Sequence, residues 1–144
     1  MSPGTTHESC SPDQTEALGA GLAAGLRPGD VVLLFGEMGS GKTTFVRGAL
    51  RALGYDGPVT SPTYTIARHY NQGPVPVVHL DLDRICDLAE EDPGFLADHL
   101  DPDGIAFVEW PQVATGDEEL RQRVAARVHL EHATPERRRV RIEP

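Results

Sequence analysis

The sequence is short of lysine, of cysteine and of long apolar runs. Only one of its 144 residues is a lysine, Lys42, against twelve arginines. The two cysteines, Cys10 and Cys86, provide no disulfide framework and are typical of a reducing compartment. The longest uninterrupted apolar run, Val31 to Phe35, is far too short to span a bilayer. Met1 to Ser9 lacks the charged and apolar regions of a signal peptide. These absences predict a cytoplasmic protein without a membrane segment.

The chain also lacks the positive charge of a protein that grips nucleic acid by electrostatics. Its formal net charge is −9 and its isoelectric point is near 5.0, whereas such proteins usually carry a basic footprint. A partner that holds the nucleic acid is not excluded by this balance. The one basic cluster is Arg137 to Arg139 with Arg141. It is compatible with screening of the acidic body, with RNA phosphates or with a nucleotide phosphate, and the sequence does not choose among them.

What the chain does contain is a phosphate-binding motif in its proper context. Gly36 to Thr43 matches G-x-x-x-x-G-K-[ST]. Val31 to Phe35 before it has the composition of a buried strand, and Thr44 to Leu53 after it has helical spacing. Glycines let the loop turn tightly, so that backbone N–H groups and the helix N-terminus face phosphate oxygens. The predicted nucleotide-binding residues are Gly36, Glu37, Met38, Gly39, Ser40, Gly41, Lys42, Thr43 and Thr44.

Two residues of this motif have specific chemical roles. Lys42 can place a compact cation on the β- and γ-phosphates, and Thr43 can offer its hydroxyl to Mg²⁺. Because the chain uses arginine wherever else it needs a cation, a lysine here indicates a role that a guanidinium cannot fill.

Two further predicted strands end in acids. Val77 to Leu80 is followed by Asp81, with His79 two residues before that acid, and Gly104 to Val108 is followed by Glu109. An acid at the end of a strand beside such a loop is the arrangement that holds Mg²⁺ directly or through water. Trp110 follows Glu109 and is interpreted as a packing anchor or as a neighbour of the nucleotide.

The remaining segments complete an α/β domain. Residues 1–10 are expected to form a flexible tail, and residues 11–144 a single three-layer domain. Ser11 and Pro12 read as the N-cap and first residue of a helix that extends to about Leu26. Alternation in Val124 to Glu131 and again at Val140 and Ile142 predicts a closing hairpin, so the sheet is expected to have a parallel core and an antiparallel edge.

Four stretches in this order resemble the TsaE (YjeE) family, the P-loop ATPase of bacterial tRNA threonylcarbamoyladenosine synthesis. They are Gly36 to Gly48, Ser61-Pro62-Thr63-Tyr64-Thr65, His79 to Arg84, and Glu109-Trp110-Pro111. The loop alone names a superfamily, whereas the four together at these separations are highly specific, and the resemblance runs from about Ser11 to Arg141.

The resemblance implies a set of roles. Thr43 and Glu109 would ligate Mg²⁺, Lys42 and Asp81 would support ATP hydrolysis to ADP, and Thr63 would belong to a switch-like loop that senses the nucleotide. Ser11 and Thr15 lie where the family places part of its adenine contact. The partners would be TsaB and TsaD, which transfer the threonylcarbamoyl group to adenosine 37 of tRNAs that read ANN codons. This chain would meet tRNA only through that complex.

The chain departs from the family pattern at Asp83. Asp83 stands where the family usually has tyrosine, which adds a carboxylate near Asp81 and puts any role of that tyrosine in doubt.

Two other classes of nucleotide-binding protein are disfavoured. A GTPase is disfavoured because guanine recognition by N-K-x-D needs a second lysine, and an ABC-type ATPase is disfavoured because its signature sequence is missing. A small-molecule kinase and a nucleotide-gated binding module with negligible turnover remain as alternatives.

Overall fold

A seven-stranded sheet forms the centre of the molecule. The computed structural model of the chain describes residues 4–37, 39–59, 67–71, 73–82, 95–110 and 118–144. Its strands are β1 (Thr5–Ser9), β2 (Val31–Phe35), β3 (Ala67–Tyr70), β4 (Val77–Asp81), β5 (Ile105–Glu109), β6 (Val124–Thr134) and β7 (Arg137–Glu143). Its helices are α1 (Pro12–Ala23), α2 (Lys42–Ala52), α3 (Phe95–His99) and α4 (Glu118–Arg123).

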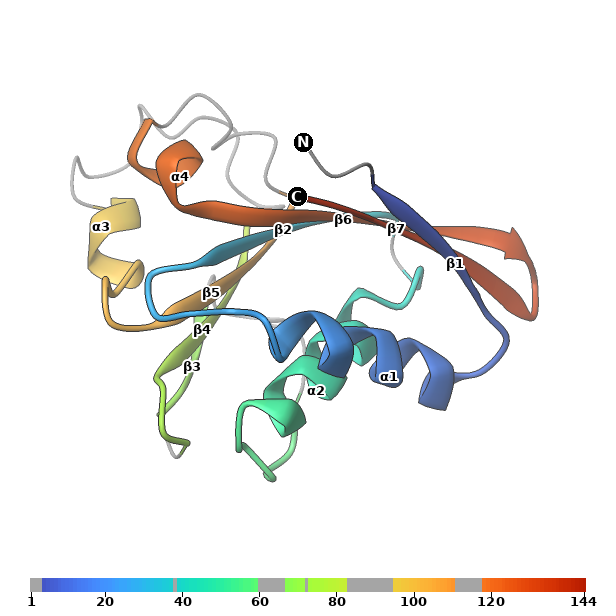
Figure 1. Cartoon of the computed structure of the whole chain (residues 1–144), viewed down its shortest axis with the longest axis horizontal. Coiled ribbons are helices and arrows are strands. Elements are labelled where there is room, and N and C mark those ends of the chain that lie inside the picture. Colours follow the sequence, from blue (N-terminus) through green and yellow to red (C-terminus); the bar gives the residue numbers. More distant parts are fainter. Residues whose placement is uncertain (1–3, 38, 60–66, 72, 83–94, 111–117) are drawn as a thin grey trace.

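The sheet combines parallel and antiparallel strands in the order β1-β7-β6-β2-β5-β4-β3. The four strands β6, β2, β5 and β4 run parallel, while β3 on one side and β7 and β1 on the other pair antiparallel. Helices α1 and α2 lie on one face, and α3 and α4 lie on the other (Figure 1). The predicted three-layer α/β domain with a mixed sheet and a closing β6–β7 hairpin is therefore confirmed. None of the helices in the described ranges has the length and apolar character needed to cross a membrane.

The central strand β2 is buried on both of its faces. Val32 and Leu34 belong to the apolar cluster under α1 and α2, whereas Val31 and Leu33 belong to the cluster under α3 and α4. A parallel strand covered by helices on both sides needs an unbroken apolar run rather than an alternating one. This requirement explains the run of five apolar residues that precedes the phosphate-binding motif.

Two glycines let α1 and α2 cross at very short range. A Cβ added at Gly19 would collide with the carbonyl oxygen of Phe45, and one added at Gly48 would collide with the carbonyl oxygen of Glu16. Gly19 therefore makes this close approach, whereas a Cβ at Gly21 would meet nothing within 4 Å. The crossing ties the N-terminal helix to the helix that follows the phosphate-binding loop.

The expectation of a loose tail over residues 1–10 is wrong for the residues of β1. Thr5–Ser9 pairs antiparallel with β7, with Thr5 opposite Ile142 and Ser9 opposite Arg138. Of its side chains only Ser9 is buried. An edge strand held by main-chain hydrogen bonds needs no apolar face, so its sequence carries little strand signal.

Arg123, the last residue of α4, ties two connecting segments together at the start of β6. Its guanidinium donates to the carbonyl oxygens of Gly29, Leu100 and Asp101, at 2.7, 3.0 and 2.9 Å respectively. A planar guanidinium with five N–H donors can serve three acceptors at once.

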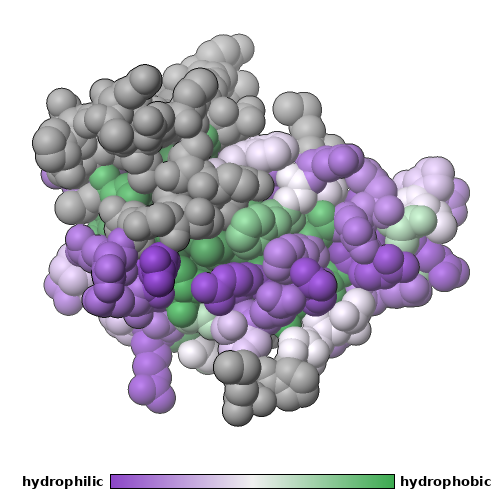
Figure 2. Space-filling model, turned by 90° about the horizontal axis from the view of Figure 1, so that it is seen from above, coloured by the Kyte–Doolittle hydropathy of each residue, from purple (hydrophilic) through white to green (hydrophobic). Residues whose placement is uncertain are grey.

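The outer part of the sheet, on the face that carries α3 and α4, is polar. Arg139 pairs with Glu131 at 2.9 Å, and Arg141 pairs with Glu143 at 3.0 Å. In Figure 2 hydrophilic side chains gather over this side of the molecule, with apolar surface toward its centre. Because cations and anions alternate there, this face carries little net charge despite its arginines.

Candidate nucleotide-binding site

The predicted phosphate-binding loop joins β2 to α2 and takes a conformation that requires glycine. Gly39 and Gly41 have φ angles of 78° and 105°, in the left-handed region, and Gly41 is the N-cap of α2. The amide of Ser40 donates to the carbonyl oxygen of Glu37 at 3.0 Å, which closes a tight turn. Met38 lies outside the described residues. The loop thus places the N-terminus of α2 directly beyond the carboxyl end of the central strand.

The start of this loop is packed without spare room. A Cβ at Gly36 would lie 2.5 Å from Ser40 Oγ and 2.6 Å from the carbonyl oxygen of Leu130 on β6. Ser40 Oγ is buried, yet within the described part of the chain it has no hydrogen-bond partner. A buried hydroxyl without a partner is unusual in a folded protein.

Lys42, the first residue of α2, folds back beneath the loop. Its Nζ donates to the carbonyl oxygen of Gly36 at 2.7 Å and lies 3.5 Å from Glu109 Oε1. It also lies over the ring of Trp110, 4.1 Å from the ring centroid. Only 6% of the Lys42 side chain is exposed. The single lysine is therefore a buried cation held by a carbonyl, a carboxylate and an aromatic face.

The two predicted acids lie side by side at the carboxyl ends of β4 and β5. Asp81 is opposite Glu109 in the parallel register, and the amide of Leu82 donates to the Glu109 carbonyl oxygen at 3.1 Å. In its side chain, Glu109 Oε1 is the oxygen near Lys42, and Oε2 is 2.5 Å from His79 Nε2. Burial by itself raises the pKa of Glu109, but the hydrogen bond and charge of His79 and the charge of Lys42 outweigh it and leave the pKa lowered. Glu109 is consequently a buried carboxylate that stays ionised at neutral pH.

Trp110 has a strained backbone at the point where β5 ends. Its φ angle of 53° is the only positive φ at a non-glycine among the described residues. Such a conformation costs about 1–3 kcal/mol and is kept where the surroundings over-determine it. Here it brings the indole ring over Lys42.

The stretch predicted to contact adenine lies beside the loop. Ser11 and Thr15 line a cavity of about 180 Å³ together with Gly39, Gly41 and Thr44. Ser11 caps α1 by accepting a hydrogen bond from the amide of Gln14, as predicted. The pairing of β1 with β7 therefore brings the start of α1 to the phosphate-binding loop. Thr63 of the predicted switch-like loop lies outside the described residues.

Three residues of this site were not assigned by the sequence reasoning. His79 is wholly buried and contacts Glu109, while Cys10 and Arg138 line the cavity beside Ser11. The alternation of β4 was a usable signal for His79, because it places His79 on the same face as Asp81. Arg138 differs from its arginine neighbours only by strand alternation, which becomes informative once the register of β7 is known.

The donor set fits a magnesium ion better than a transition metal. Thr43, in the first turn of α2, and Glu109 offer oxygen, the ligand type that Mg²⁺ prefers, and Mg²⁺ usually takes only one or two protein carboxylates beside phosphate and water. Among the described residues no group of three or more His, Cys, Asp or Glu side chains could hold a metal ion. The residues present thus suit a metal that is completed by a phosphorylated ligand.

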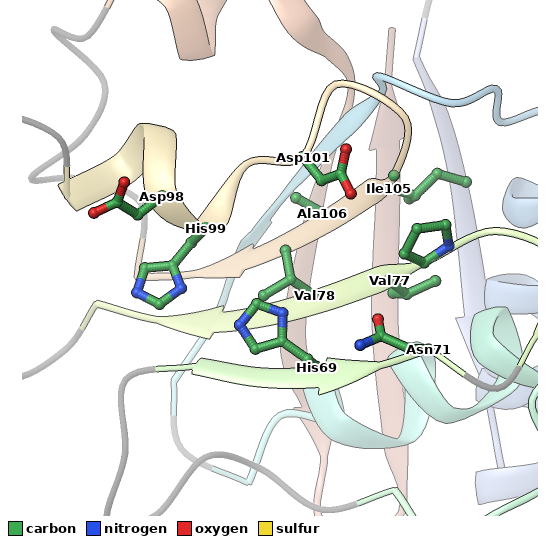
Figure 3. A pocket seen from close by; sticks show the side chains of 11 residues that line it. His69, Asn71, Val77, Val78, Asp98, His99, Asp101, Ile105 and Ala106 are labelled. Carbon is green, nitrogen blue, oxygen red and sulfur yellow. The ribbon is translucent and has the colours of Figure 1, made fainter.

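A second cavity lies at the opposite end of β4 and β5. It measures about 170 Å³ and is lined by His69, Asp98 and His99 among others. Figure 3 shows the rings of His69 and His99 turned toward one another, 5.6 Å apart between centroids. Burial, followed by repulsion from His69, lowers the pKa of His99. This cavity contains none of the predicted site residues.

The strand–loop–helix unit and the buried lysine and carboxylate beneath it define an α/β domain of the P-loop class. Within this class, a comparison with protein-family models identifies the family: residues 9–140 match the model described as threonylcarbamoyl adenosine biosynthesis protein TsaE. The chain belongs to the TsaE family.

Individual relatives agree with this assignment. The chain is 42% identical over 100 residues to the tRNA threonylcarbamoyladenosine biosynthesis protein TsaE of Bacillus subtilis, and 41% identical over 101 residues to that of Synechocystis. These matches cover 69% and 68% of this chain, and 62% and 64% of those proteins, so the matched part spans less than two thirds of either relative. The crystal structure of Bacillus subtilis YdiB aligns with a TM-score of 0.71 at 27% identity, covering 99% of this chain and 86% of that one.

Proposed function

We propose that this protein is the ATP-binding, Mg²⁺-dependent ATPase that acts on a TsaB–TsaD complex during threonylcarbamoyl modification of adenosine 37 in tRNAs that read ANN codons. It contacts tRNA only through that complex and works in the cytoplasm. Membership of the TsaE family supports the pathway, because its curated members are named for tRNA threonylcarbamoyladenosine biosynthesis. The net charge of −9 supports the division of labour with partners that hold the tRNA.

The observation that carries the proposal is the buried group formed by Lys42, Glu109 and His79 under the phosphate-binding loop. The side chains of Lys42 and Glu109 are 6% and 5% exposed, and that of His79 is wholly buried. Burying a cation and a carboxylate is costly, and apolar residues would often stabilise a fold as well or better. A site that must hold phosphate and metal is a physical reason to keep them.

The residues of the chain divide the work of hydrolysis. The loop amides and the N-terminus of α2 bind the phosphates, and Lys42 leaves Glu109 to neutralise the charge that develops on them. Thr43 and Glu109 supply oxygens to Mg²⁺, which neutralises phosphate charge when it is bound. Asp81, beside Glu109 in the register, orients the attacking water. The cavity lined by Ser11 and Thr15 receives the adenosine end.

The test compares two cations of the same helix. Lys42→Ala removes the buried cation, whereas Arg47→Ala removes a cation that is one third exposed and lies 3.8 Å from Glu16. We expect Lys42→Ala to weaken ATP and ADP binding at least tenfold and to abolish Mg²⁺-dependent hydrolysis, with Arg47→Ala close to the parent. Quenching or enhancement of the fluorescence of Trp110, the only tryptophan, reports binding directly. Equal nucleotide affinity of the two variants would refute the site.

The partners decide the biological role. We expect slow ATP turnover by the pure protein and a large increase when TsaB and TsaD from the same source are added. Turnover that ignores them but responds to a small acceptor would indicate the kinase alternative. Nucleotide binding with no turnover under either condition would indicate a binding module.

A further inference from the structure

His79 occupies a position at which an apolar residue would be expected. It lies in the middle of β4, a strand whose other described core positions are valine and leucine, and none of its surface is exposed. Burying an imidazole costs free energy unless its polar atoms find partners. In the described part of the chain only one of its two nitrogens has a partner, since Nδ1 is buried without a hydrogen bond. The residue is therefore a poor choice for stability alone.

The partner of the other nitrogen is the carboxylate of the candidate metal site. In the parallel register His79 is opposite Phe107, and Glu109 is the next residue of β5 on the same face. The imidazole thus reaches diagonally across the two strands, and its Nε2 lies 2.5 Å from Glu109 Oε2. The remaining oxygen, Oε1, is 3.5 Å from Lys42 Nζ, which itself donates to the loop at Gly36.

We propose that His79 is the positioning residue of Glu109: it holds Oε2 from the core side, so that Oε1 alone is presented to the phosphate-binding loop and to the Mg²⁺ that the proposed function requires. This inference rests on that proposed function and extends it. A glutamate has three rotatable side-chain bonds, and without an anchor its carboxylate turns toward Lys42 with either oxygen. Partners that orient a ligating carboxylate typically change metal affinity by about 10- to 100-fold when they are removed.

The chemistry of amide side chains provides a matched pair of variants. Glutamine is long enough to place its N–H₂ near the position of the histidine Nε2, whereas the shorter asparagine places its N–H₂ near the position of Nδ1. His79→Gln is therefore expected to keep the hydrogen bond to Oε2, and His79→Asn to lose it. His69→Asn makes the same replacement on the neighbouring strand β3, at an exposed residue of the other cavity, and serves as the control.

The experiment measures metal binding rather than turnover. Each variant is loaded with ADP and titrated with Mn²⁺, with bound metal followed by electron paramagnetic resonance, and ADP affinity is measured separately in EDTA. We expect the Mn²⁺ affinity to fall about tenfold or more in His79→Asn and by less than about threefold in His79→Gln and His69→Asn. ADP affinity in EDTA is expected to stay within about twofold in all three, because His79 makes its hydrogen bond to Glu109 and not to a described residue of the loop.

Three results would overturn the proposal. Unchanged Mn²⁺ affinity in His79→Asn would show that Glu109 needs no anchor, equal losses in the Asn and Gln variants would show that the hydrogen bond is not what matters, and parallel loss of metal-free ADP binding would indicate a merely structural role. These results differ from a failure of the proposed function, which Lys42→Ala tests through ADP binding.

A second measurement covers the case in which the buried variants do not fold. In ¹⁵N-labelled wild-type protein without nucleotide, His79 should show a slowly exchanging, low-field Nε2 proton signal. The signal should disappear in Glu109→Ala and persist in His69→Asn. Its absence from the wild type would refute the contact.

Discussion

Replacement of Gly19 by alanine tests the crossing of α1 and α2, on which the cavity proposed to receive adenosine depends. The new Cβ would overlap the Phe45 carbonyl oxygen and lie 3.0 Å from the Phe45 carbonyl carbon and 3.1 Å from the Ala49 nitrogen. All three atoms are backbone, so no side chain can swing aside and the helices have to separate. Gly21→Ala makes the same change two residues further along α1, where a Cβ would meet nothing within 4 Å.

The expected effects differ in sign. Alanine in a helix is favoured over glycine by about 1 kcal/mol, so Gly21→Ala should stabilise the protein by roughly 0.5–1 kcal/mol. Gly19→Ala gains the same amount but adds an overpacking cost of about 1–3 kcal/mol or more, because rigid backbone is displaced. Its net effect should be a destabilisation of about 1–2 kcal/mol. For a domain of this length these values correspond to melting temperatures roughly 2 °C higher and 3–6 °C lower, respectively.

Urea unfolding followed by circular dichroism measures both variants against the parent. Equal denaturant slopes are required, so that a shift of the midpoint reports stability alone. The ADP affinity of Gly19→Ala should also fall, because a displaced α1 carries Thr15 away from the loop. If Gly19→Ala and Gly21→Ala stabilise the protein equally, the two helices do not pack at the separation seen here.

Three further predictions follow from other contacts. Arg123→Ala should destabilise the protein by about 2–3 kcal/mol in urea unfolding, because it leaves three carbonyl oxygens without their charged donor. Arg121→Ala, at an exposed neighbouring residue, should change the stability by less than about 0.5 kcal/mol. Similar losses of stability in both variants would contradict this role of Arg123. The lowered pKa of Glu109 predicts a contribution to stability that is present above the ordinary pKa of 4.5 and is lost as the pH falls through the folded-state pKa. The free energy of unfolding of the parent should therefore exceed that of Glu109→Gln by less at pH 3 than at neutral pH. A constant difference in unfolding free energy across that range would exclude the linkage. In a Cys86→Ser background ADP should slow alkylation of Cys10, which is exposed and lines the cavity with Ser11; an unchanged rate would place the adenosine elsewhere.

The parts of this fold that sequence could predict are those whose residues are selected by burial or by local hydrogen bonds. The predicted strand Val31 to Phe35 coincides with β2, because an unbroken apolar run between helices admits few other structures. Ser11 and Pro12 begin α1 as expected, since capping depends only on neighbouring residues. The helix ends at Ala23 rather than near Leu26. Helix ends are less well determined, and Gly25 and the turn after it compete with the helix there.

The parts that sequence could not predict depend on register between distant segments. β1 consists of polar residues whose place is fixed only by pairing with β7, at the other end of the chain. His79 and Glu109 are separated by 30 positions, and their contact follows from the parallel alignment of β4 with β5. Likewise, Arg138 lines the cavity beside the loop while Arg139 pairs with Glu131 on the other face, a difference that alternation creates once the strand is placed.

The surroundings of Lys42 explain why the only lysine of the chain stands where it does. Its Nζ is 2.7 Å from a carbonyl oxygen, 3.5 Å from a carboxylate oxygen and 4.1 Å from the centroid of an indole ring, in a space that is almost closed to solvent. A compact ammonium fits among three such groups and can rotate its three protons from one acceptor to another, whereas a guanidinium is planar and wider. Under the proposed function, a phosphate that entered the loop would compete with Glu109 for this cation. The exchange would free a carboxylate for the metal that accompanies the nucleotide, so one movement of Lys42 would prepare both halves of the proposed site.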